Sequence, residues 1–566
     1  MNNTITDAYK KVPLMFQAQT QGRCQLNYIA DLRKEESKQK QDVEIWTEQW
    51  TEKAEDKTPE FPETVETQIY QLSWRFVTNG GQDEGIIRPA IGARGVPFYP
   101  GSSMKGAFRQ ACRQLAPDKV RDYCGDADKP GILRFHGGYP VDSSWQEDLV
   151  DLVHPQQGWQ VKTKNTKSKP RGEGAFALIS LYQPELKFGI SSNKDLDKTE
   201  WEEIWQIWQQ AISSGLGCRV SAGYGQPTKQ KGKILYRAYL EGQGIASQVI
   251  GGDSEFRPNM FKASIRGHAL RIFGGLTDAS RAERLVENLF GGVTGSGTYG
   301  LLAMNWNDAI EPIYDEFEEG YGEPTYKAKG ILRWLQTQSL PDAKSKSLTK
   351  LIKVLMRFSM LLGGYGKSWR RVDHRLFYEE YYEGKQKKPL IGCHWQWREK
   401  SWDKFNLIVN PKQVAGFFNN LEAVAKEWMQ IEGVKPQPHQ HADWREAWHK
   451  DNVQVWGRVA RDKQDSKAIP WFHGAYRPAI REINQPEGSI YRTDMTGRIG
   501  QISRIWHRMY PLARRLKNPQ PKQPEYKFPP NPQYIEFLTI FPERTDICDD
   551  FLKFLNSNNS DFTKLW

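Results

Sequence analysis

The chain has 566 residues and a formal net charge of +11, from 79 lysines and arginines against 68 acidic residues. At roughly 150 residues per domain this length predicts two to four domains, and the 21 Trp, 23 Tyr and 25 Phe exclude a chain that is disordered throughout. No apolar run approaches the roughly 20 residues of a membrane span, so we expect a cytoplasmic protein with no membrane partner, whose basic excess favours a polyanion.

The N-terminal part predicts one helix outside the first core and one strand that begins it. Residues 31–55 are rich in helix formers and charges and contain no Gly or Pro, which predicts an exposed helix. From Ile69 to Phe76 apolar and polar residues alternate, which is the pattern of a half-buried strand. A glycine-rich loop over residues 79–95 follows.

The stretch Pro100–Arg109, with the sequence PGSSMKGAFR, is the sharpest local motif. Ser102 and Ser103 can cap the start of a helix, and Lys105 and Arg109 fall one turn apart on one face. Free backbone N–H groups at such a helix start attract anions, which favours a binding site for phosphate. The alternative is an ordinary capped helix whose basic side chains are solvated.

A second glycine motif closes the first half of the chain. Between the two motifs lie a basic loop with Lys162, Lys164 and Lys167, a predicted strand over 175–182 and a predicted helix over 201–213. The loop SGLGCRVSAGYGQ then spans residues 214–226. Residues 227–233 read as a linker, because they are polar and contain Pro and Gly.

The order of motifs repeats after this linker. A strand is predicted over 234–240, and a helix follows with the sequence ASIRGHALR, in which Ser264, Arg266 and Arg271 repeat the hydroxyl and basic pattern. A helix ending in LFGG comes next, and then a glycine and basic loop over 361–375 with Arg370 and Arg371. We therefore predict an internal repeat of architecture, with a first domain over 1–230 and a second over 231–566.

The pattern is weaker past residue 375. A Trp-rich stretch suggests a large helical or irregular insertion at about 380–490 within the second domain. Residues 498–517 carry Arg504 and Arg508 between Trp506 and Tyr510, which predicts an amphipathic helix able to bind RNA. The alternative is a helix whose basic face is only solvated. A Pro-rich connector over 519–532 leads to a last predicted strand over 534–541.

Together these motifs resemble the RAMP superfamily of CRISPR-associated proteins. The stretches PFYPGSSMKGAFR and GLGCRVSAGYG carry the resemblance in the first half, and SIRGHALR, LFGG and GGYGKSWRR in the second. The resemblance implies an α+β chain of two ferredoxin-like (RRM-like) modules with antiparallel sheets. It also implies a backbone subunit of a type III effector complex in antiviral defence. Its partners would be a CRISPR guide RNA, complementary target RNA, and other RAMP-family and large subunits.

The resemblance also assigns residues to RNA. Ser102, Ser103, Lys105 and Arg109 would hold guide phosphates, and the loop with Arg219, Ser221 and Tyr224 would lie against the same backbone. Phosphate contacts fix register and carry no sequence information, as interchangeable guides require. The other candidates are Lys162, Lys164, Lys167, Ser264, Arg266, Arg271, Arg370, Arg371, Arg504 and Arg508.

The resemblance leaves catalysis open. Relatives that cut RNA place an Asp before the PGSS helix, where this chain reads EGIIRPAIG with Ile87 at the matching place. If the chain is an endoribonuclease, its catalytic carboxylate would be Asp253 in the second domain or, as the weaker candidate, Asp83. Cleavage would need Mg²⁺, whereas RNA binding alone requires no cofactor. A guide-processing enzyme ranks last, because His136 and His268 lack an evident acid–base partner.

Overall fold

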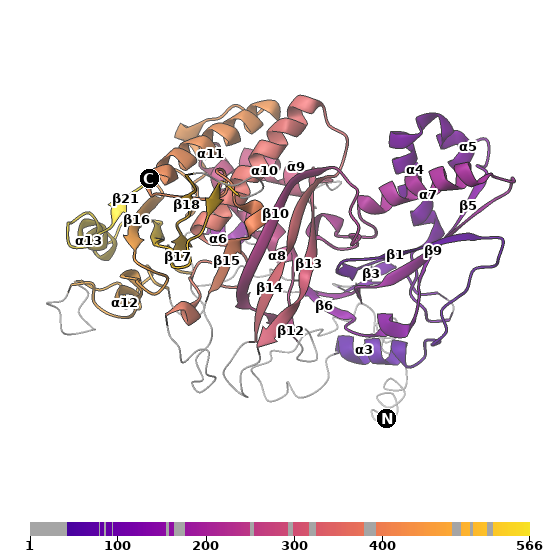
Figure 1. Cartoon of the computed structure of the whole chain (residues 1–566), viewed down its shortest axis with the longest axis horizontal. Helices are drawn as coiled ribbons and strands as arrows, with labels where there is room; N and C mark the ends of the chain where they lie inside the picture. Colours follow the sequence, from indigo (N-terminus) through magenta and orange to yellow (C-terminus); the bar gives the residue numbers. More distant parts are fainter. Residues whose placement is uncertain are drawn as a thin grey trace, which may run out of the picture.

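The protein is described by a computed structural model with α+β architecture. It covers residues 42–78, 80–83, 86–92, 94–153, 158–163, 176–248, 254–292, 298–315, 324–377, 392–477, 488–497, 502–517 and 524–566. Three antiparallel sheets with their helices follow one another across the molecule (Figure 1). None of the helices within these ranges is long and apolar enough to cross a membrane.

The first sheet has the strand order β1-β9-β5, with neighbouring strands antiparallel. Its elements are β1 (Glu66–Gln71), α4 (Gly101–Leu115), β5 (Leu133–Pro140), β9 (Glu185–Ser192) and α7 (Lys198–Ser213). The predicted helices at both motifs are confirmed. Met104 and Phe108 of α4 pack with Phe188 of β9 and Trp208 of α7 in one core, because apolar residues recur at helical spacing on each helix.

Smaller elements surround this first unit. A mixed sheet has the order β3-β4-β7-β6 and a short pair joins β2 to β8. The bounds are β2 (Arg75–Phe76), β3 (Gly81–Asp83), β4 (Ile86–Arg88), β6 (Val150–Val153), β7 (Phe176–Ile179), β8 (Leu181–Tyr182), α3 (Asp42–Thr51), α5 (Val120–Cys124) and α6 (Gly158–Lys162). The predicted N-terminal helix, of which α3 is the described part, is not exposed, because Val43 and Trp46 are buried and Trp50 contacts Trp145.

The second sheet has the order β13-β14-β10-β15, again antiparallel. Its unit contains β10 (Ile234–Ile245), α8 (Asn259–Gly274), α9 (Ala279–Phe290), β13 (Leu302–Asp315), β14 (Thr325–Gln336), α10 (Asp342–Leu362) and β15 (Cys393–Trp397), with the short pair β11 (Ser247–Gln248) and β12 (Ser254–Glu255) between β10 and α8. Helices α8 and α10 contact each other, and α10 also packs on β10. The predicted strand and helices of the repeat are confirmed.

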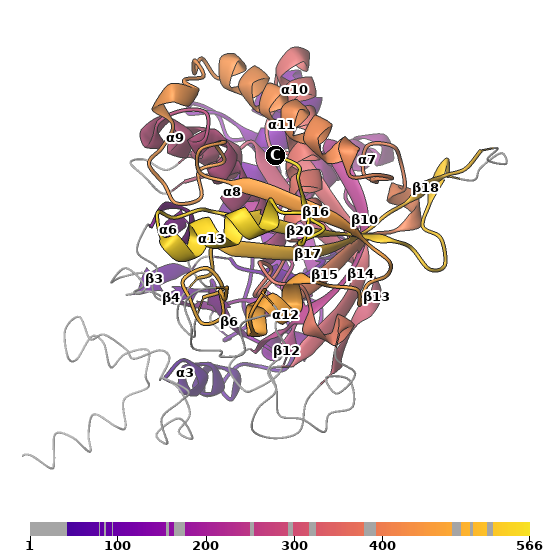
Figure 2. The same cartoon turned by 90° about the vertical axis from the view of Figure 1, so that its left-hand side faces the viewer.

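A third sheet follows, with the order β17-β20-β16-β21 (Figure 2). Its unit contains β16 (Gln454–Ala460), α12 (Ala468–His473), β17 (Ile505–Pro511), β20 (Tyr534–Ile540), α13 (Asp546–Leu555) and β21 (Thr563–Lys564), with β18 (Arg514–Arg515) and β19 (Tyr526–Lys527) as a separate pair. Helix α11 (Lys412–Ile431) lies between β15 and β16 in the chain and packs on α10. The region after residue 231 therefore holds two sheets, where the sequence predicted one module and an insertion.

The predicted amphipathic helix over 498–517 is wrong. Its described part contains the strand β17, of which every residue is buried. A strand covered on both faces shows no alternation of apolar and polar side chains, so its pattern resembled a helix with a basic face. Helix α10 covers part of this strand.

A buried ionic hub joins the second and third units to the first. Glu446, which is fully buried, accepts hydrogen bonds from Arg271 at 2.6 Å and from Arg370 at 2.7 Å, and it pairs with Arg445. Its backbone N–H donates to the carbonyl of Val161 in α6 at 3.1 Å. Although burial acts to raise the pKa of this carboxyl, the three guanidinium groups hold it well below its usual range.

Candidate nucleic-acid interface

The glycine loop over 214–226 is locked against the first unit by backbone contacts. The N–H of Leu216 donates to the carbonyl of Gly225 at 2.9 Å within the loop. The N–H of Gly225 donates to the backbone carbonyl of Arg75 in β2 at 2.8 Å. Gly225 has φ +60°, and a Cβ there would lie 1.9 Å from the Leu216 carbonyl oxygen. Only glycine fits such a position, so the motif produces one rigid loop shape.

This loop delivers Arg219 and Ser221 to helix α8 of the second unit. The ammonium of Lys262, on α8, donates to the Ser221 hydroxyl at 2.6 Å. Arg266 lies one turn further along the same helix. We call Arg219, Lys262 and Arg266 the junction cluster. It unites residues from both sequence motifs, which lie about forty positions apart along the chain.

The junction cluster gathers three basic side chains, of which Lys262 and Arg266 are poorly solvated. Lys262 is only 7% exposed, and burial together with the charges of Arg266 and Arg219 lowers its pKa to about 7. Burial also lowers the pKa of Arg266, against the opposing effect of Glu287 and Glu283. An anion placed beside these groups would favour their charged forms, so the geometry suits a phosphate.

Lys162 borders this cluster from the first half of the chain. It ends α6, forms an ion pair with Glu283 of α9 and lies over the ring of Trp444, with its nitrogen 5.5 Å from the ring centroid. Lys164 and Lys167 lie outside the described residues. The only member of this predicted basic loop that the structure places is therefore Lys162, and it already has a carboxylate partner.

The start of α4 presents an exposed polar face, but the two serines do not cap the helix as predicted. Ser102 and Ser103 lie within the first turn, and the N-cap is Pro100 without a side-chain hydrogen bond. Both serines and Lys105 are exposed, so they are free to meet an anion beside the helix start. Arg109 is half-buried and its guanidinium donates to the carbonyl of Gly125.

Five of the predicted RNA ligands are at most 8% exposed, namely Tyr224, Ser264, Arg271, Arg370 and Arg508. The Tyr224 hydroxyl donates to Asp151. Arg271 and Arg370 belong to the hub of Glu446, and Arg508 donates to the carbonyl of Trp395 at 2.5 Å. Burying a guanidinium is tolerated here because a carboxylate or a carbonyl receives it.

The remaining candidates are dispersed. Arg504 forms an ion pair with Glu543 at 2.8 Å, and Arg371 lines a cavity between the second and third units. Asp83 ends β3, and Asp253 lies outside the described residues, just before β12. Within the described residues no group of three or more His, Cys, Asp and Glu could hold a metal ion.

The two histidines weighed as acid–base candidates lie apart. His268 is fully buried against the rings of Phe358 and Trp369, and burial lowers its pKa well below the usual range. His136 is exposed and its Nε2 lies 2.8 Å from the Ser191 hydroxyl. A fully buried ring cannot exchange protons with an RNA at the surface, so the structure offers this pair no shared site.

Sequence reasoning missed the residues that join the first unit to the second. Arg75, fully buried in β2, pairs with Glu255 of β12 at 2.5 Å, and Glu255 also accepts from Trp74 at 2.9 Å. Lys262 was missed as well, although it precedes Arg266 by one helical turn in the sequence. That spacing was a usable signal, whereas nothing in the sequence links Arg75 to Glu255.

Comparison with known proteins places part of this site in a family. The model of the RAMP superfamily matches residues 77–227, which include α4 and the glycine loop. We call these matched residues the RAMP segment. The RAMP segment supplies Arg219 and Ser221 of the interface, while Lys262 and Arg266 lie beyond the matched residues. No curated protein matches the chain.

Two solved structures resemble parts of the chain. One is a chain of "Cryo-EM structure of the Type III-B Cmr-beta bound to cognate target RNA", with 16% identity and a TM-score of 0.25, covering 40% of this chain and 90% of that one. The other is "Crystal structure of Cmr6 from Pyrococcus furiosus", with 14% identity and a TM-score of 0.20, covering 30% of this chain and 98% of that one.

Proposed function

We propose that the chain binds RNA as a backbone subunit of a type III CRISPR ribonucleoprotein, where it holds the guide RNA and the guide–target duplex for antiviral defence. The observation that carries the proposal is the junction cluster. Lys262 and Arg266 of α8 meet Arg219 of the RAMP segment in a site where burial weakens their solvation. A row of RNA phosphates would add negative charge beside these groups without requiring a particular base.

The topology supports a chain built from repeated RNA-binding modules. In the second and third units the elements run strand, helix, strand, strand, helix, strand, and the third strand pairs between the first and second. This is the ferredoxin-like arrangement. The first unit has the same order up to α7, and a single bridge between Leu72 and Pro227 stands at the place of a fourth strand. We therefore interpret the chain as three ferredoxin-like units.

The exposed start of α4 offers a second place for phosphates in the first unit. Ser102, Ser103 and Lys105 are all exposed there, and a helix N-terminus favours anions. Other RAMP-family subunits, large subunits, the guide and complementary target RNA would be the partners of such a protein in the cytoplasm.

The test is co-purification from cells that express the neighbouring genes, followed by extraction of bound RNA. We expect guide-sized RNA with the wild type and a clear loss with Arg266→Met. The matched control is Arg398→Met. Arg398 is an exposed arginine that pairs with Glu241 and does not belong to the junction cluster. Absence of RNA from the wild-type complex would refute the proposal.

The alternative is a metal-dependent endoribonuclease subunit that uses Asp253, or less readily Asp83. The assembled complex is incubated with labelled complementary RNA and Mg²⁺, as wild type and as Asp253→Ala. Cleavage products that survive the substitution support a holding role. Loss of one product with assembly intact would assign cleavage to the loop before β12.

A further inference from the structure

A cavity of about 170 Å³ lies between the second and third units. Its walls include Arg371 from the loop after α10, Phe472 and His473 from α12, and Ile505 and His507 from β17. Tyr491 borders it from the segment before β17. All of these residues lie outside the RAMP segment, and the interface described above uses none of them.

The cavity is positively charged on one side. Arg371 is half-buried, burial lowers its pKa, and within the described residues it forms no ion pair with a carboxylate. Burial and the charge of Arg371 lower the pKa of His473 on the facing helix. A poorly solvated guanidinium without an acidic partner is a ready site for an anion.

His507 lines this cavity from β17. The side chain is only 3% exposed, and its Nε2 lies 3.0 Å from the carboxylate of Glu536. Its Nδ1 has no hydrogen-bond partner among the described residues.

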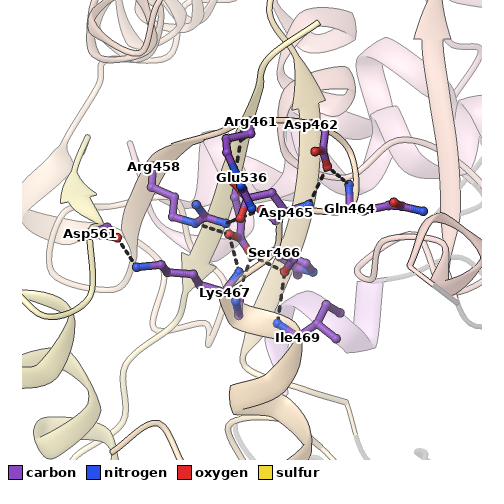
Figure 3. A network of polar contacts seen from close by, with 12 residues as sticks. Arg458, Arg461, Asp462, Gln464, Asp465, Ser466, Lys467, Ile469, Glu536 and Asp561 are labelled. Carbon is purple, nitrogen blue, oxygen red and sulfur yellow. Dashed lines mark hydrogen bonds and ion pairs between the residues drawn. The ribbon is translucent and has the colours of Figure 1, made fainter. Parts of the chain in front are cut away.

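A network around Glu536 holds these walls in place (Figure 3). The carboxylate accepts hydrogen bonds from Arg458 at 2.6 Å and from the backbone N–H groups of Lys467 and Ala468 at 3.0 Å. The last two contacts satisfy the start of α12, the helix that carries Phe472 and His473. The cavity is therefore preformed, because one buried carboxylate orients both His507 and α12.

The size and chemistry of the cavity select its ligand. Sites for drug-sized ligands occupy about 300–1,000 Å³, so this smaller cavity has room for one nucleobase and not for a whole nucleotide. Aromatic walls favour stacking of a nucleobase, and the guanidinium favours a phosphate. We propose that the cavity binds the base of one nucleotide against Phe472 and Tyr491, with the phosphate of that nucleotide on Arg371.

The nucleotide can come from two sources. It is either one unpaired residue of an RNA strand bound by the chain or a free mononucleotide. Both sources present the same phosphate, ribose and base, so the structure defines the shared chemistry, and the experiment separates the sources. The proposal goes beyond the holding of guide RNA and does not depend on it, because a mononucleotide can be measured without any guide.

The first arm is calorimetric titration of the RNA-free full chain with AMP, GMP, CMP and UMP, and with adenosine and inorganic phosphate as probes. We expect a nucleoside monophosphate to bind at least tenfold more tightly than adenosine or phosphate alone. Arg371→Met should weaken nucleotide binding at least tenfold and leave adenosine unchanged, and Phe472→Leu should weaken both. Arg515→Met, which removes an exposed arginine paired with Glu525, is the matched control.

The second arm locates the source by photocrosslinking. RNA containing 4-thiouridine is bound to the full chain, and crosslinked peptides are mapped by mass spectrometry. A crosslink at the segment with Phe472 or Tyr491 that AMP competes away identifies a residue of the RNA strand. Mononucleotide binding without such a crosslink identifies a free nucleotide. If no mononucleotide binds, or if Arg371→Met binds as well as wild type, the proposal is wrong even where RNA still co-purifies.

Discussion

Lys262→Met removes the buried ammonium of the junction cluster and keeps a side chain of similar length. Lys262 is 7% exposed, and its pKa falls from 10.5 to about 7. One pKa unit corresponds to about 1.36 kcal/mol, so the fold disfavours the charged form by about 5 kcal/mol. Removing the ammonium removes this cost and should raise the free energy of unfolding. The gain should be only about 1–3 kcal/mol, because the Ser221 hydroxyl loses its hydrogen-bond donor.

The same substitution should weaken RNA binding. A hydrogen bond to a charged group contributes about 1.5–3 kcal/mol, which is at least about a tenfold change in affinity. The slope of log affinity against log salt should fall by about 0.7, the value for one phosphate contact on a single strand. Urea denaturation measures stability, and fluorescence anisotropy with labelled RNA at several salt concentrations measures binding.

The matched control for this experiment is Lys350→Met. Lys350 is exposed on α10 and pairs with Glu427 at 3.0 Å, so its loss changes net charge by the same amount without touching the cluster. We expect little change in stability or in the salt slope. A Lys262→Met protein that is less stable than wild type and binds RNA equally well would refute the reasoning, because it would show that the ammonium only supports the glycine loop.

Three further predictions follow from the structure. Affinity for RNA should be highest below pH 7 and should fall by up to about tenfold per pH unit above it. The reason is that a bound phosphate raises the pKa of Lys262 from its value of about 7 in the RNA-free protein. Fluorescence anisotropy from pH 6 to 9 tests this, and an affinity that does not change with pH would contradict it. Lys105→Ala with Arg109→Ala should weaken RNA binding and flatten its salt dependence, and unchanged values would remove α4 from the interface. Glu446→Ala should cost about 3–5 kcal/mol, because three buried guanidinium groups lose their partner, and a loss below about 1 kcal/mol in urea denaturation would show that the hub is not structural.

The elements that the sequence predicted well are those whose signal is local. Helix α4 follows from the spacing of Met104 and Phe108, and the shape of the glycine loop follows from positions such as Gly225 that no other residue can occupy. Both lie in the RAMP segment. The strand β20 was predicted for the same reason, because six of its seven residues are apolar or β-branched and the strand adjoins a Pro-rich connector.

The elements that were missed depend on tertiary contacts. Arg271 and Arg508 looked like surface cations because nothing near them in sequence indicates their partners, Glu446 and the carbonyl of Trp395. The strand β17 was taken for a helix because both of its faces are covered. The third sheet was not recognised as a unit of its own, since its strands are separated by long polar stretches that carry no periodic pattern.

The reach of α6 determines how freely the first two units can move. Although α6 belongs in sequence to the first unit, it contacts α8, and Gln160 and Val161 accept hydrogen bonds from Arg445 and Glu446. The short linker over 227–233 is therefore not a hinge. Together with the buried pair of Arg75 and Glu255, these contacts join the two units at places other than the linker, so a chain cut within the linker would still hold its two halves together.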